Sequence, residues 1–549
     1  MIRVTSLQLP LDHEEGAFLS AIAARLGIET TAIESWTLFK RSYDARRRNA
    51  IKLVYAVDVE TPLEAEVLAR LADDQTVRPT PDMTYRPPTI APRASLEHSP
   101  RPVVIGAGPC GLFAALVLAE MGLRPLVLER GKKARERTVD TFGFWRGGGL
   151  DPESNVQFGE GGAGTFSDGK LYSQIRDPRH HGRKVLTEFV AAGARPEILY
   201  ESRPHVGTYR LVKMVENLRA KIESLGGEFR FNTRVDRLLT EDGTVRGLRL
   251  HNGDELRADH VVLAVGHSAR DTFEMLRDCG VHIEPKPFSI GLRIEHPQAM
   301  IDARRFGRNA GHPLLGAADY RLAHHCTGPG LEGRSVYSFC MCPGGTVVAS
   351  SSEPGRVVTN GMSQHDRAER NANSAIVVDM TPEGDFPGDV LAGMALQRRY
   401  EALAFETGGG TYEAPGQLVG DFLAGQPSSV LGAVNPSYQP GVRLGDLAGC
   451  LPEFAVAAIR EALPVFDRKL RGFAREDAVL TGVETRTSSP IRIRRGDDGQ
   501  SINTRGLFPA GEGAGYAGGI LSAGVDGIRA AEAVALALAS TAGPAGGGG

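Results

Sequence analysis

The stretch that decides the fold is VVIGAGPCGLFAALVLAEMGLRPLVLER, residues 103–130. An apolar run ends in Gly106-x-Gly108-x-x-Gly111, a run of small and apolar residues follows, and a second apolar run ends at Glu129. This order predicts a strand, a glycine turn, a helix and a second strand. Such a unit places a pyrophosphate on the helix N-terminus and a carboxylate on ribose hydroxyls. The stretch predicts a Rossmann-like α/β domain that binds a dinucleotide, either a nicotinamide or a flavin.

A second glycine-rich stretch, NTRGLFPAGEGAGYAGGILSAGVDGIRAAEAVALALA at 503–539, distinguishes the two cofactors. It predicts a strand at 506–510, the pair Gly511-Glu512, and a glycine-rich entry to a helix. The stretch resembles the closing segment of glutathione-reductase-type flavoproteins, in which a carboxylate after the late strand holds a ribityl hydroxyl. Glu512 stands where those proteins have Asp. The resemblance implies FAD, which is long enough to need both ends of the domain.

Residues 228–269 supply a third piece, a predicted β-meander followed by an apolar strand that ends at Gly266. In the same flavoproteins, the residue at the position of Val235 contacts adenine through its backbone. The turn at the position of Gly266 passes near the cofactor.

With these pieces the chain resembles, over nearly its whole length, a family of bacterial and plastid FAD-dependent dehydrogenases. The most specific stretches are FGEGGAGTFSDGK (158–170), AVGHSARDTFEML (264–276), FCMCPGGTVVASS (from 339) and ETRTSSPIRI (484–493). The resemblance implies a three-layer β/β/α FAD-binding domain, an inserted α+β substrate domain and a small N-terminal ferredoxin-like α/β unit. It says little about the substrate.

The glycines of 158–170 free the backbone to lie against a ring or phosphates, and Thr165, Ser167 and Asp168 are expected to bond ribityl or pyrophosphate oxygens. An ordinary glycine-rich surface loop is the alternative. The predicted cofactor-binding residues are Gly106, Gly108, Pro109, Cys110, Gly111, Glu129, Arg130, Gly161, Gly162, Gly164, Thr165, Ser167, Asp168, Lys170, Val235, Gly266, Gly511, Glu512, Gly518, Gly519 and Ile520.

The predicted catalytic residues are His267, Arg486 and Lys170. Lys170 or Arg486 is expected to stabilise the anionic reduced flavin, and His267 is expected to donate a proton, with His296 as an alternative donor. Arg293 and Arg486 are candidates for binding an anionic substrate group. Their alternative role is to pair with nearby glutamates, Glu295 and Glu484.

These features predict an FAD-dependent dehydrogenase or reductase that passes hydride through flavin N5 to or from a small molecule of unassigned identity. The chain has no second GxGxxG in a strand–helix setting, so a dedicated NAD(P)H domain is not expected, although NAD(P)H remains a candidate electron donor. CxxC spacing is also absent, which disfavours a flavin–disulfide reductase. One alternative is a flavin monooxygenase. Another is an RNA-associated or regulatory protein that FAD stabilises.

Two cysteine-containing patterns remain open. Cys340-Met341-Cys342 is compatible with a thiol pair beside the flavin, but a CxC spacing strains a disulfide, and strand packing of the sulfur residues is favoured. His324-His325-Cys326 lacks a second ligand cluster of matching spacing, so no metal site is predicted.

Residues 1–78 predict the order β-α-β-β-α-β of a ferredoxin-like unit. Its KRSYDARRRNAIK stretch suits RNA or another anionic partner, and a solvated hairpin end is the alternative. The expected divisions are 1–78, a proline-rich linker at 79–101, the first part of the FAD-binding domain at 102–270, the inserted domain at 271–475, the closing part of the FAD-binding domain at 476–540 and a tail at 541–549.

The bulk composition is that of an ordinary globular protein, with 549 residues, 41% hydrophobic residues and a formal net charge of −3. Such a charge does not suit a wholly basic nucleic-acid binder. No signal peptide and no uncharged apolar run near the ~20 residues of a membrane span is visible. Six cysteines, irregularly spread, suit a reducing compartment, and the expected location is the cytoplasm without membrane association.

Overall fold

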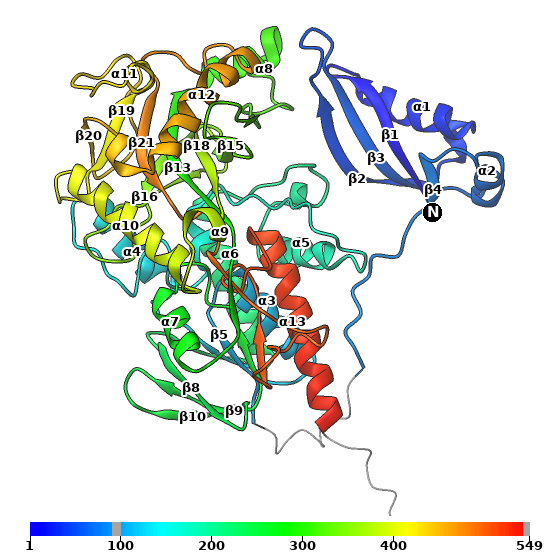
Figure 1. Cartoon of the computed structure of the whole chain (residues 1–549). Coiled ribbons are helices and arrows are strands. Elements are labelled where there is room, and N and C mark those ends of the chain that lie inside the picture. The colour runs from blue at the N-terminus through cyan, green and yellow to red at the C-terminus, as the bar shows by residue number, and fades with distance from the viewer. Residues whose placement is uncertain (90–99, 542–549) are drawn as a thin grey trace, which may run out of the picture.

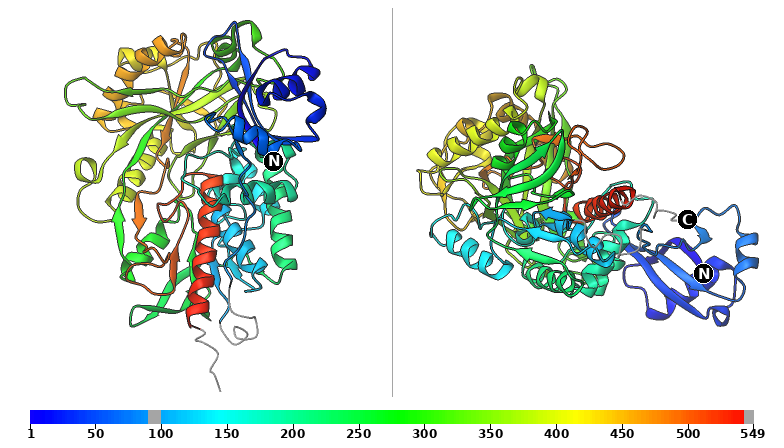
Figure 2. Two further views of the ribbon diagram at one scale, coloured as in Figure 1. Left: turned by 90° about the vertical axis from the view of Figure 1, so that its right-hand side faces the viewer. Right: turned by 90° about the horizontal axis from the view of Figure 1, so that it is seen from below.

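Three packed parts form the chain in the computed structural model, which describes residues 1–89 and 100–541. An N-terminal α/β unit projects from the side of a larger body, which combines a parallel-sheet domain with a second domain built on a large mixed sheet (Figures 1 and 2). The predicted linker 79–101 and tail 541–549 lie partly outside the described residues, at 90–99 and 542–549.

The N-terminal unit is a four-stranded antiparallel sheet in the order β2-β3-β1-β4, with two helices against it. Its elements follow the order β-α-β-β-α-β that the sequence predicts. Ile2, Val4, Val57 and Val59 are fully buried in its core. The elements are β1 (Ile2–Pro10), α1 (Glu15–Leu26), β2 (Ser35–Asp44), β3 (Lys52–Glu60), α2 (Glu64–Arg70) and β4 (Val77–Pro79).

The basic stretch of this unit forms the β2–β3 hairpin, and part of it joins the unit to the body. Arg41 forms an ion pair with Glu201 of the parallel-sheet domain. The ring of Tyr43 lies edge-on to Phe306 of the second domain, 5.6 Å between centroids. The arginines at 46–48 remain exposed. One end of this basic stretch therefore serves a domain contact, and at its tip Asn309 Nδ2 donates to the Arg48 carbonyl oxygen at 2.9 Å while the arginine side chains are exposed.

The parallel-sheet domain has three layers. Its five strands run in the order β23-β11-β5-β6-β7, and all neighbouring pairs are parallel. Val104 and Val262 pack against helices on one face, whereas Val103 and Val261 pack against an antiparallel meander on the other. The strands are β5 (Val103–Ile105), β6 (Leu126–Leu128), β7 (Glu228–Arg230), β11 (Val261–Leu263) and β23 (Leu507–Pro509); the helices are α3 (Pro109–Glu120), α5 (His181–Ala191), α6 (Thr208–Ser224) and α13 (Ile520–Thr541); the meander is β8 (Val235–Glu241), β9 (Thr244–Leu250) and β10 (Glu255–Arg257).

Further elements join this domain to its neighbour. Helix α4 (Ala134–Trp145) ends at Trp145, whose Nε1 donates to the carbonyl oxygen of Ala349 in the second domain at 2.8 Å. Helix α7 (Arg270–Asp278) follows β11, and β12 (Ile283–Pro285) pairs with β22 (Ile491–Ile493) at the return from the second domain.

The second domain contains a seven-stranded sheet in the order β14-β15-β18-β13-β21-β19-β20. Strand β21 corrects a predicted boundary: the sequence assigned residues after 475 to the closing part of the FAD-binding domain, but β21 pairs with β13 inside this sheet. Its strands are β13 (Phe288–Pro297), β14 (Ala323–His325), β15 (Ser335–Cys342), β18 (Asn371–Met380), β19 (Ala414–Leu418), β20 (Val442–Leu444) and β21 (Val479–Glu484), with the hairpin β16 (Gly345–Ala349) and β17 (Thr359–Ser363) and helices α8 (Gln298–Phe306), α9 (Pro382–Asp385), α10 (Ala392–Thr407), α11 (Val419–Ala424) and α12 (Glu453–Lys469).

Within the described residues, every helix falls short of the length or the apolarity that a membrane crossing requires.

Candidate active site

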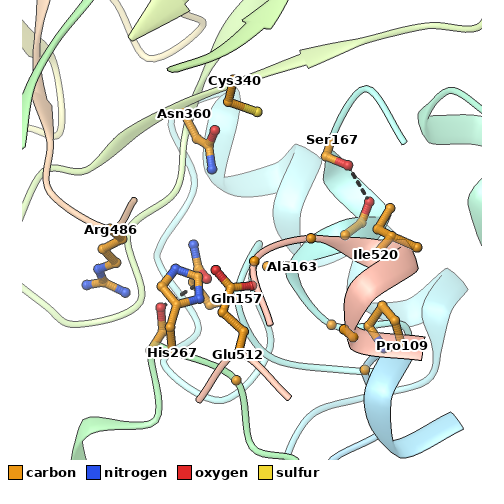
Figure 3. A pocket seen from close by; sticks show the side chains of 18 of the residues that line it. Pro109, Gln157, Ala163, Ser167, His267, Cys340, Asn360, Arg486, Glu512 and Ile520 are labelled. Carbon is orange, nitrogen blue, oxygen red and sulfur yellow. Dashed lines mark hydrogen bonds between the residues drawn. The ribbon is translucent and has the colours of Figure 1, made fainter. Parts of the chain in front are cut away.

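The carboxyl ends of the parallel strands open into a cavity of about 820 Å³, which the second domain closes from the opposite side. In Figure 3, Pro109 and Ile520 lie at one side of this cavity and Arg486 and His267 at the other. Most predicted site residues line it. They are Gly106, Gly108, Pro109, Cys110, Glu129, Arg130, Gly162, Gly164, Ser167, Asp168, Lys170, Val235, Gly266, His267, Arg486, Glu512, Gly518, Gly519 and Ile520.

The turn after β5 lines the cavity with the backbone of two glycines, which have no side chain. Gly106 has a φ of +101°, and a Cβ there would lie 2.4 Å from the carbonyl oxygen of Ala264. Gly108 has an ordinary φ of −75°, but its hypothetical Cβ would lie 3.7 Å from the Cα of Gly162. Helix α3 begins directly afterwards, so its positive end faces the cavity. This corner suits a phosphate group.

The carboxylate of Glu129 organises the loops around this corner. Its Oε2 accepts a hydrogen bond from the amide of Ala107 at 2.8 Å. Its Oε1 accepts from the amides of Gly131 at 2.9 Å and Gly159 at 3.0 Å. The ribose contact predicted for Glu129 would therefore add to a structural role that the sequence analysis did not foresee.

The two ends of the parallel-sheet domain meet at this cavity. Strand β23 pairs with β11, which in turn pairs with β5. A Cβ at Gly511 would lie 2.9 Å from the Cβ of Cys110. Helix α13 begins at Ile520, after Gly518 and Gly519, which are exposed along the cavity wall.

Glu512 projects into the cavity between these two ends (Figure 3). Burial raises the pKa of its carboxyl to about 7, while Lys286 acts in the opposite direction. Within the described part of the chain its carboxyl oxygens have no hydrogen-bond partner. Glu512 is therefore free to bond a polar ligand, as predicted for a ribityl hydroxyl.

Some predicted cofactor contacts lie behind the wall and are corrected here. A Cβ at Gly111 would lie 1.9 Å from the Gly106 carbonyl oxygen, so this glycine serves the packing of α3. Thr165 is only 1% exposed, and its Oγ1 accepts from Nη1 of Arg137 at 3.4 Å. The predicted contacts that do not line the cavity are Gly111, Gly161, Thr165 and Gly511.

Asp168 and Lys170 reach the cavity with their polar groups already bonded. Nε of Arg367 donates to Oδ1 of Asp168 at 2.9 Å. Although burial opposes ionisation, Arg367 and Lys170 hold the pKa of Asp168 below its ordinary value. Lys170 Nζ donates to the carbonyl oxygen of Met341. Arg367 uses one acceptor site on each oxygen of this carboxylate, and the hydrogen bond from a cofactor oxygen to Asp168 stays a prediction.

His267 lines the cavity as a neutral imidazole. Burial, with Arg486 and Arg270 nearby, lowers its pKa to about 3. A charged imidazolium is therefore not available near neutral pH, which argues against the predicted donation of a proton from that form. The alternative donor, His296, is fully buried away from the cavity. Its ring contacts the Phe473 carbonyl oxygen at 2.6 Å, so it belongs to the core.

Arg486 is held by a partner that the sequence analysis did not identify. Its Nη2 and Nε donate to Glu401 at 3.0 and 3.1 Å, and its Nη1 donates to Ser352 Oγ at 2.6 Å. Arg270 donates to the same carboxylate at 2.6 Å. Two arginines thus share one buried glutamate at the edge of the cavity.

Arg293 pairs with Glu484. Of the two roles considered for Arg293, binding a substrate anion or pairing with a nearby glutamate, the structure shows the second. Its Nη1 lies 3.0 Å from Oε2 of Glu484. Burial raises the pKa of Glu484 to about 7, and Arg293 limits that rise. Arg293 lies in the wall behind Glu484, so binding a substrate anion is not its role here.

The cavity also includes residues that the sequence analysis did not place there. Gln157, whose Oε1 accepts from Ser268 Oγ at 3.0 Å, directly precedes the glycine-rich stretch. Its position beside that stretch was the available signal. Other additions come from strands of the second domain, and no spacing linked them to the nucleotide motifs. Examples are Tyr337, Cys340, Asn360 and Glu484.

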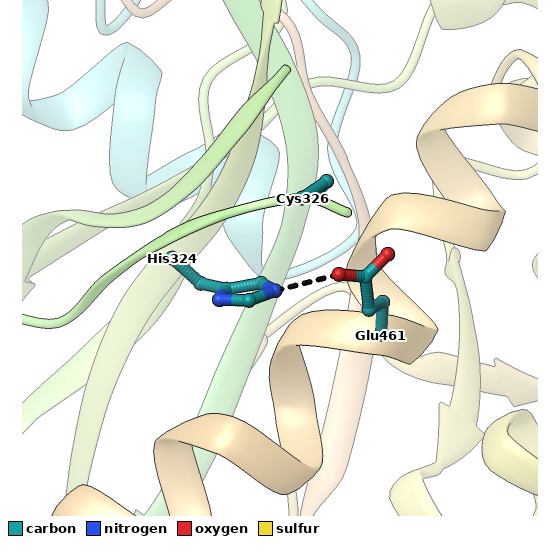
Figure 4. A group of neighbouring side chains, drawn as sticks. All are labelled: His324, Cys326 and Glu461. Atoms are coloured by element: carbon teal, nitrogen blue, oxygen red, sulfur yellow. Dashed lines mark hydrogen bonds and ion pairs between the residues drawn. The ribbon is translucent and has the colours of Figure 1, made fainter. Parts of the chain in front are cut away.

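One group with metal-ligand chemistry lies outside the cavity. His324, Cys326 and Glu461 bring ligand atoms within 4.8 Å of one another (Figure 4). Glu461 already accepts from His324 at 2.8 Å and from the amides of Thr327 and Gly328 at 2.8 and 3.0 Å. Burial raises the pKa of the Cys326 thiol to about 11. These contacts explain the group as a tie between α12 and the loop after β14.

Comparison with known families gives this geometry a context. Residues 287–487 match a family described as FAD-dependent protein, C-terminal domain-like, and residues 198–311 match one described as FAD dependent oxidoreductase. Residues 1–60 match a domain of unknown function. Over 535 residues the chain is 48% identical to an uncharacterized protein of Clostridium beijerinckii, spanning 97% of this chain and 98% of that protein. The chain belongs to an FAD-dependent oxidoreductase family.

Other similar proteins align with a smaller part of the chain or have lower sequence identity to it. Protein FixC of Escherichia coli is 27% identical over 208 residues, which are 37% of this chain and 45% of FixC. A halogenase PltM mutant solved with FAD has a TM-score of 0.39 at 13% identity, covering 80% of this chain and 70% of that one. Glycine oxidase from Geobacillus kaustophilus has a TM-score of 0.34 at 12% identity, covering 79% and 94%.

Proposed function

We propose that the cavity binds FAD along its length and that the protein is a dehydrogenase or reductase for a small-molecule substrate. The observation that carries this proposal is the convergence of two glycine-rich turns, hundreds of residues apart, on one cavity. The β5–α3 turn and the β23–α13 turn both line it. A shorter nucleotide would need only the first of these turns.

The residues present fit this cofactor. Gly108 and Gly162 leave room for a pyrophosphate at the N-terminus of α3. Val235 and Glu129 line the part of the cavity next to β6 and β8, where an adenosine would lie. Glu512, whose carboxyl oxygens have no hydrogen-bond partner among residues 1–89 and 100–541, offers an acceptor for a ribityl hydroxyl. When bound, FAD supplies two-electron hydride chemistry.

The chain's own residues would prepare the reacting end of the cavity. Arg486 provides a fixed positive charge, held by Glu401. His267, neutral near pH 7, is able to donate or accept a hydrogen bond without changing charge. Glu484, with a pKa of about 7, is suited to take up or release a proton at working pH.

The first test is the absorbance spectrum of the purified protein, followed by anaerobic addition of NADH and of NADPH. A flavin spectrum that bleaches with either donor supports a reductase that uses that donor. Rapid reoxidation in air through an oxygen adduct, seen by stopped-flow absorbance, would favour a monooxygenase instead. A colourless protein that takes up no added FAD overturns the proposal.

A Gly108→Val variant tests the cofactor position. The backbone at 108 tolerates a side chain, but valine would stand opposite Gly162 in the space assigned to the pyrophosphate. We expect folded protein with at least a tenfold loss of FAD affinity, equivalent to about 1.4 kcal/mol. Gly143→Ala is the matched control, because Gly143 is an exposed helical glycine with nothing within 4 Å of an added Cβ. Equal flavin content in both variants would contradict the placement.

A further inference from the structure

Strand β15 breaks its regular pairing where it meets the cavity. Its register with β18 shifts between Phe339 and Cys342. Within this bulge Cys340 has a φ of +45°, in the left-handed region that non-glycine residues rarely adopt. Bulges next to functional sites redirect side chains, and here Cys340 lines the cavity while Cys342 is fully buried behind it.

The bulge brings the Cys342 thiol against the backbone of Cys340. Cys342 Sγ donates to the Cys340 carbonyl oxygen at 3.4 Å. A CxC spacing strains a disulfide in an extended strand because the two side chains lie too far apart. The left-handed φ of Cys340 breaks this extended geometry.

Cationic side chains surround this pair. Arg293 Nη2 donates to the Cys340 carbonyl oxygen at 2.9 Å and lies 3.7 Å from Cys342 Sγ. Lys170 Nζ bonds the carbonyl oxygen of Met341, between the two cysteines. The hydrogen bond from Cys342, and then Lys170 and Arg293, lower the pKa of Cys340 against the effect of burial. The lowered pKa of Cys340 favours its thiolate form, the nucleophilic form of a cysteine, at the cavity surface.

We propose that Cys340 and Cys342 form a redox-active dithiol, in which Cys340 attacks small organic disulfides that enter the cavity and Cys342 resolves the mixed disulfide. This activity needs no flavin, so it goes beyond the proposed function.

The exchange balances in two steps. The Cys340 thiolate attacks one sulfur of the substrate disulfide, an S–S bond forms, and the other sulfur leaves as a thiolate. Cys342 then passes its proton to the thiolate that left, attacks Cys340 Sγ and releases the second sulfur as a thiolate. The two cysteines lose two electrons, and the substrate gains them and leaves as one thiol and one thiolate, which takes its proton from water.

The first measurement is alkylation of the native, flavin-containing protein by iodoacetamide across a pH series, with each cysteine quantified by peptide mass spectrometry. We expect Cys340 to react at least tenfold faster than Cys279 near neutral pH, with a midpoint below the ordinary thiol value of about 8.5. Cys279 is the matched control because it is partly exposed but outside the cavity. The charged groups that face the pair and shape this profile are Lys170, Arg293, Arg367, Asp168, Glu484 and Glu512.

The second measurement uses hydroxyethyl disulfide as the probe. Wild-type protein should form an internal Cys340–Cys342 disulfide, C342S should accumulate a mixed disulfide at Cys340, and C340S should form neither product. C279S should behave as wild type. Cys340 alkylation no faster than that of Cys279, or a C342S protein without the mixed disulfide, would overturn the inference. If the same samples retain the flavin spectrum, the proposed cofactor function stands independently of that failure.

Discussion

The two walls of the cavity are built in opposite ways. The backbone wall consists of Gly106, Gly108, Gly162, Gly518 and Gly519, and presents peptide groups with no side chain between them and the ligand. The side-chain wall consists of Cys340, Glu484 and Arg486, which the second domain supplies.

This difference separates binding from chemistry. A polyanionic cofactor is held by amides and helix ends, which need only the absence of side chains. Reactivity needs ionisable side chains with shifted pKa values, and such shifts arise where these side chains are buried and lie next to other charges. Substitutions on the backbone wall should therefore affect binding more than stability, whereas loss of a charge behind the side-chain wall should affect stability first.

The largest expected effect is on the side-chain wall, with Glu401→Ala. Glu401 is fully buried and bonds both Arg270 and Arg486. Its removal leaves two arginines without their main partner and should lower the free energy of unfolding by about 3–5 kcal/mol. Denaturant unfolding followed by circular dichroism measures this loss. Glu406→Ala, at an exposed position of the same helix, should change stability by less than about 0.5 kcal/mol. Equal stability of the two variants would break the comparison.

Glu129→Ala should give an intermediate effect, because this residue supports the backbone wall with a side chain. The amides of Ala107, Gly131 and Gly159 would lose their acceptor, which should cost about 1–3 kcal/mol of stability. FAD affinity should fall as well, as measured by flavin fluorescence during titration of the apoprotein. Glu136→Ala, an exposed acid on α4, is the control. Unchanged FAD affinity in Glu129→Ala would remove this residue from the cofactor site.

The smallest expected effect is the pH dependence due to Glu512. Its folded-state pKa of about 7 lies above that of the unfolded chain, because burial favours the neutral carboxyl. The stability it contributes is full below the ordinary glutamate pKa and is lost as pH rises through 7. Between about pH 5 and pH 8, wild-type apoprotein should lose on the order of 1 kcal/mol more than Glu512→Gln.

Unfolding free energies of the two apoproteins at several pH values measure this difference. Burial also raises the pKa of Glu484, so the unfolding free energy of the Glu512→Gln variant should still fall with rising pH. Parallel curves for the two proteins would show that Glu512 is solvated like a surface acid.

The backbone wall was largely predictable from the chain, and the side-chain wall was not. Gly106, Gly108 and Gly518 stand in local patterns that report strand, turn and helix at known spacing. Arg486 was recognised, but its partner Glu401 lies 85 positions away on another element. The prediction that Cys340 packs within a regular strand was made without knowledge of the bulge. A shift of one residue in the strand register moves a side chain to the opposite face of the sheet.

By itself the sequence determined the dinucleotide fold, the order of the N-terminal unit and the glycine turns, because these follow from local periodicity and from residues without a side chain. Only the tertiary structure decided which charges are paired, that β21 joins the second sheet, and that the Cys340 thiol faces the cavity. Those outcomes depend on the packing of strands far apart in the chain, where burial and neighbouring charges set the protonation of each group.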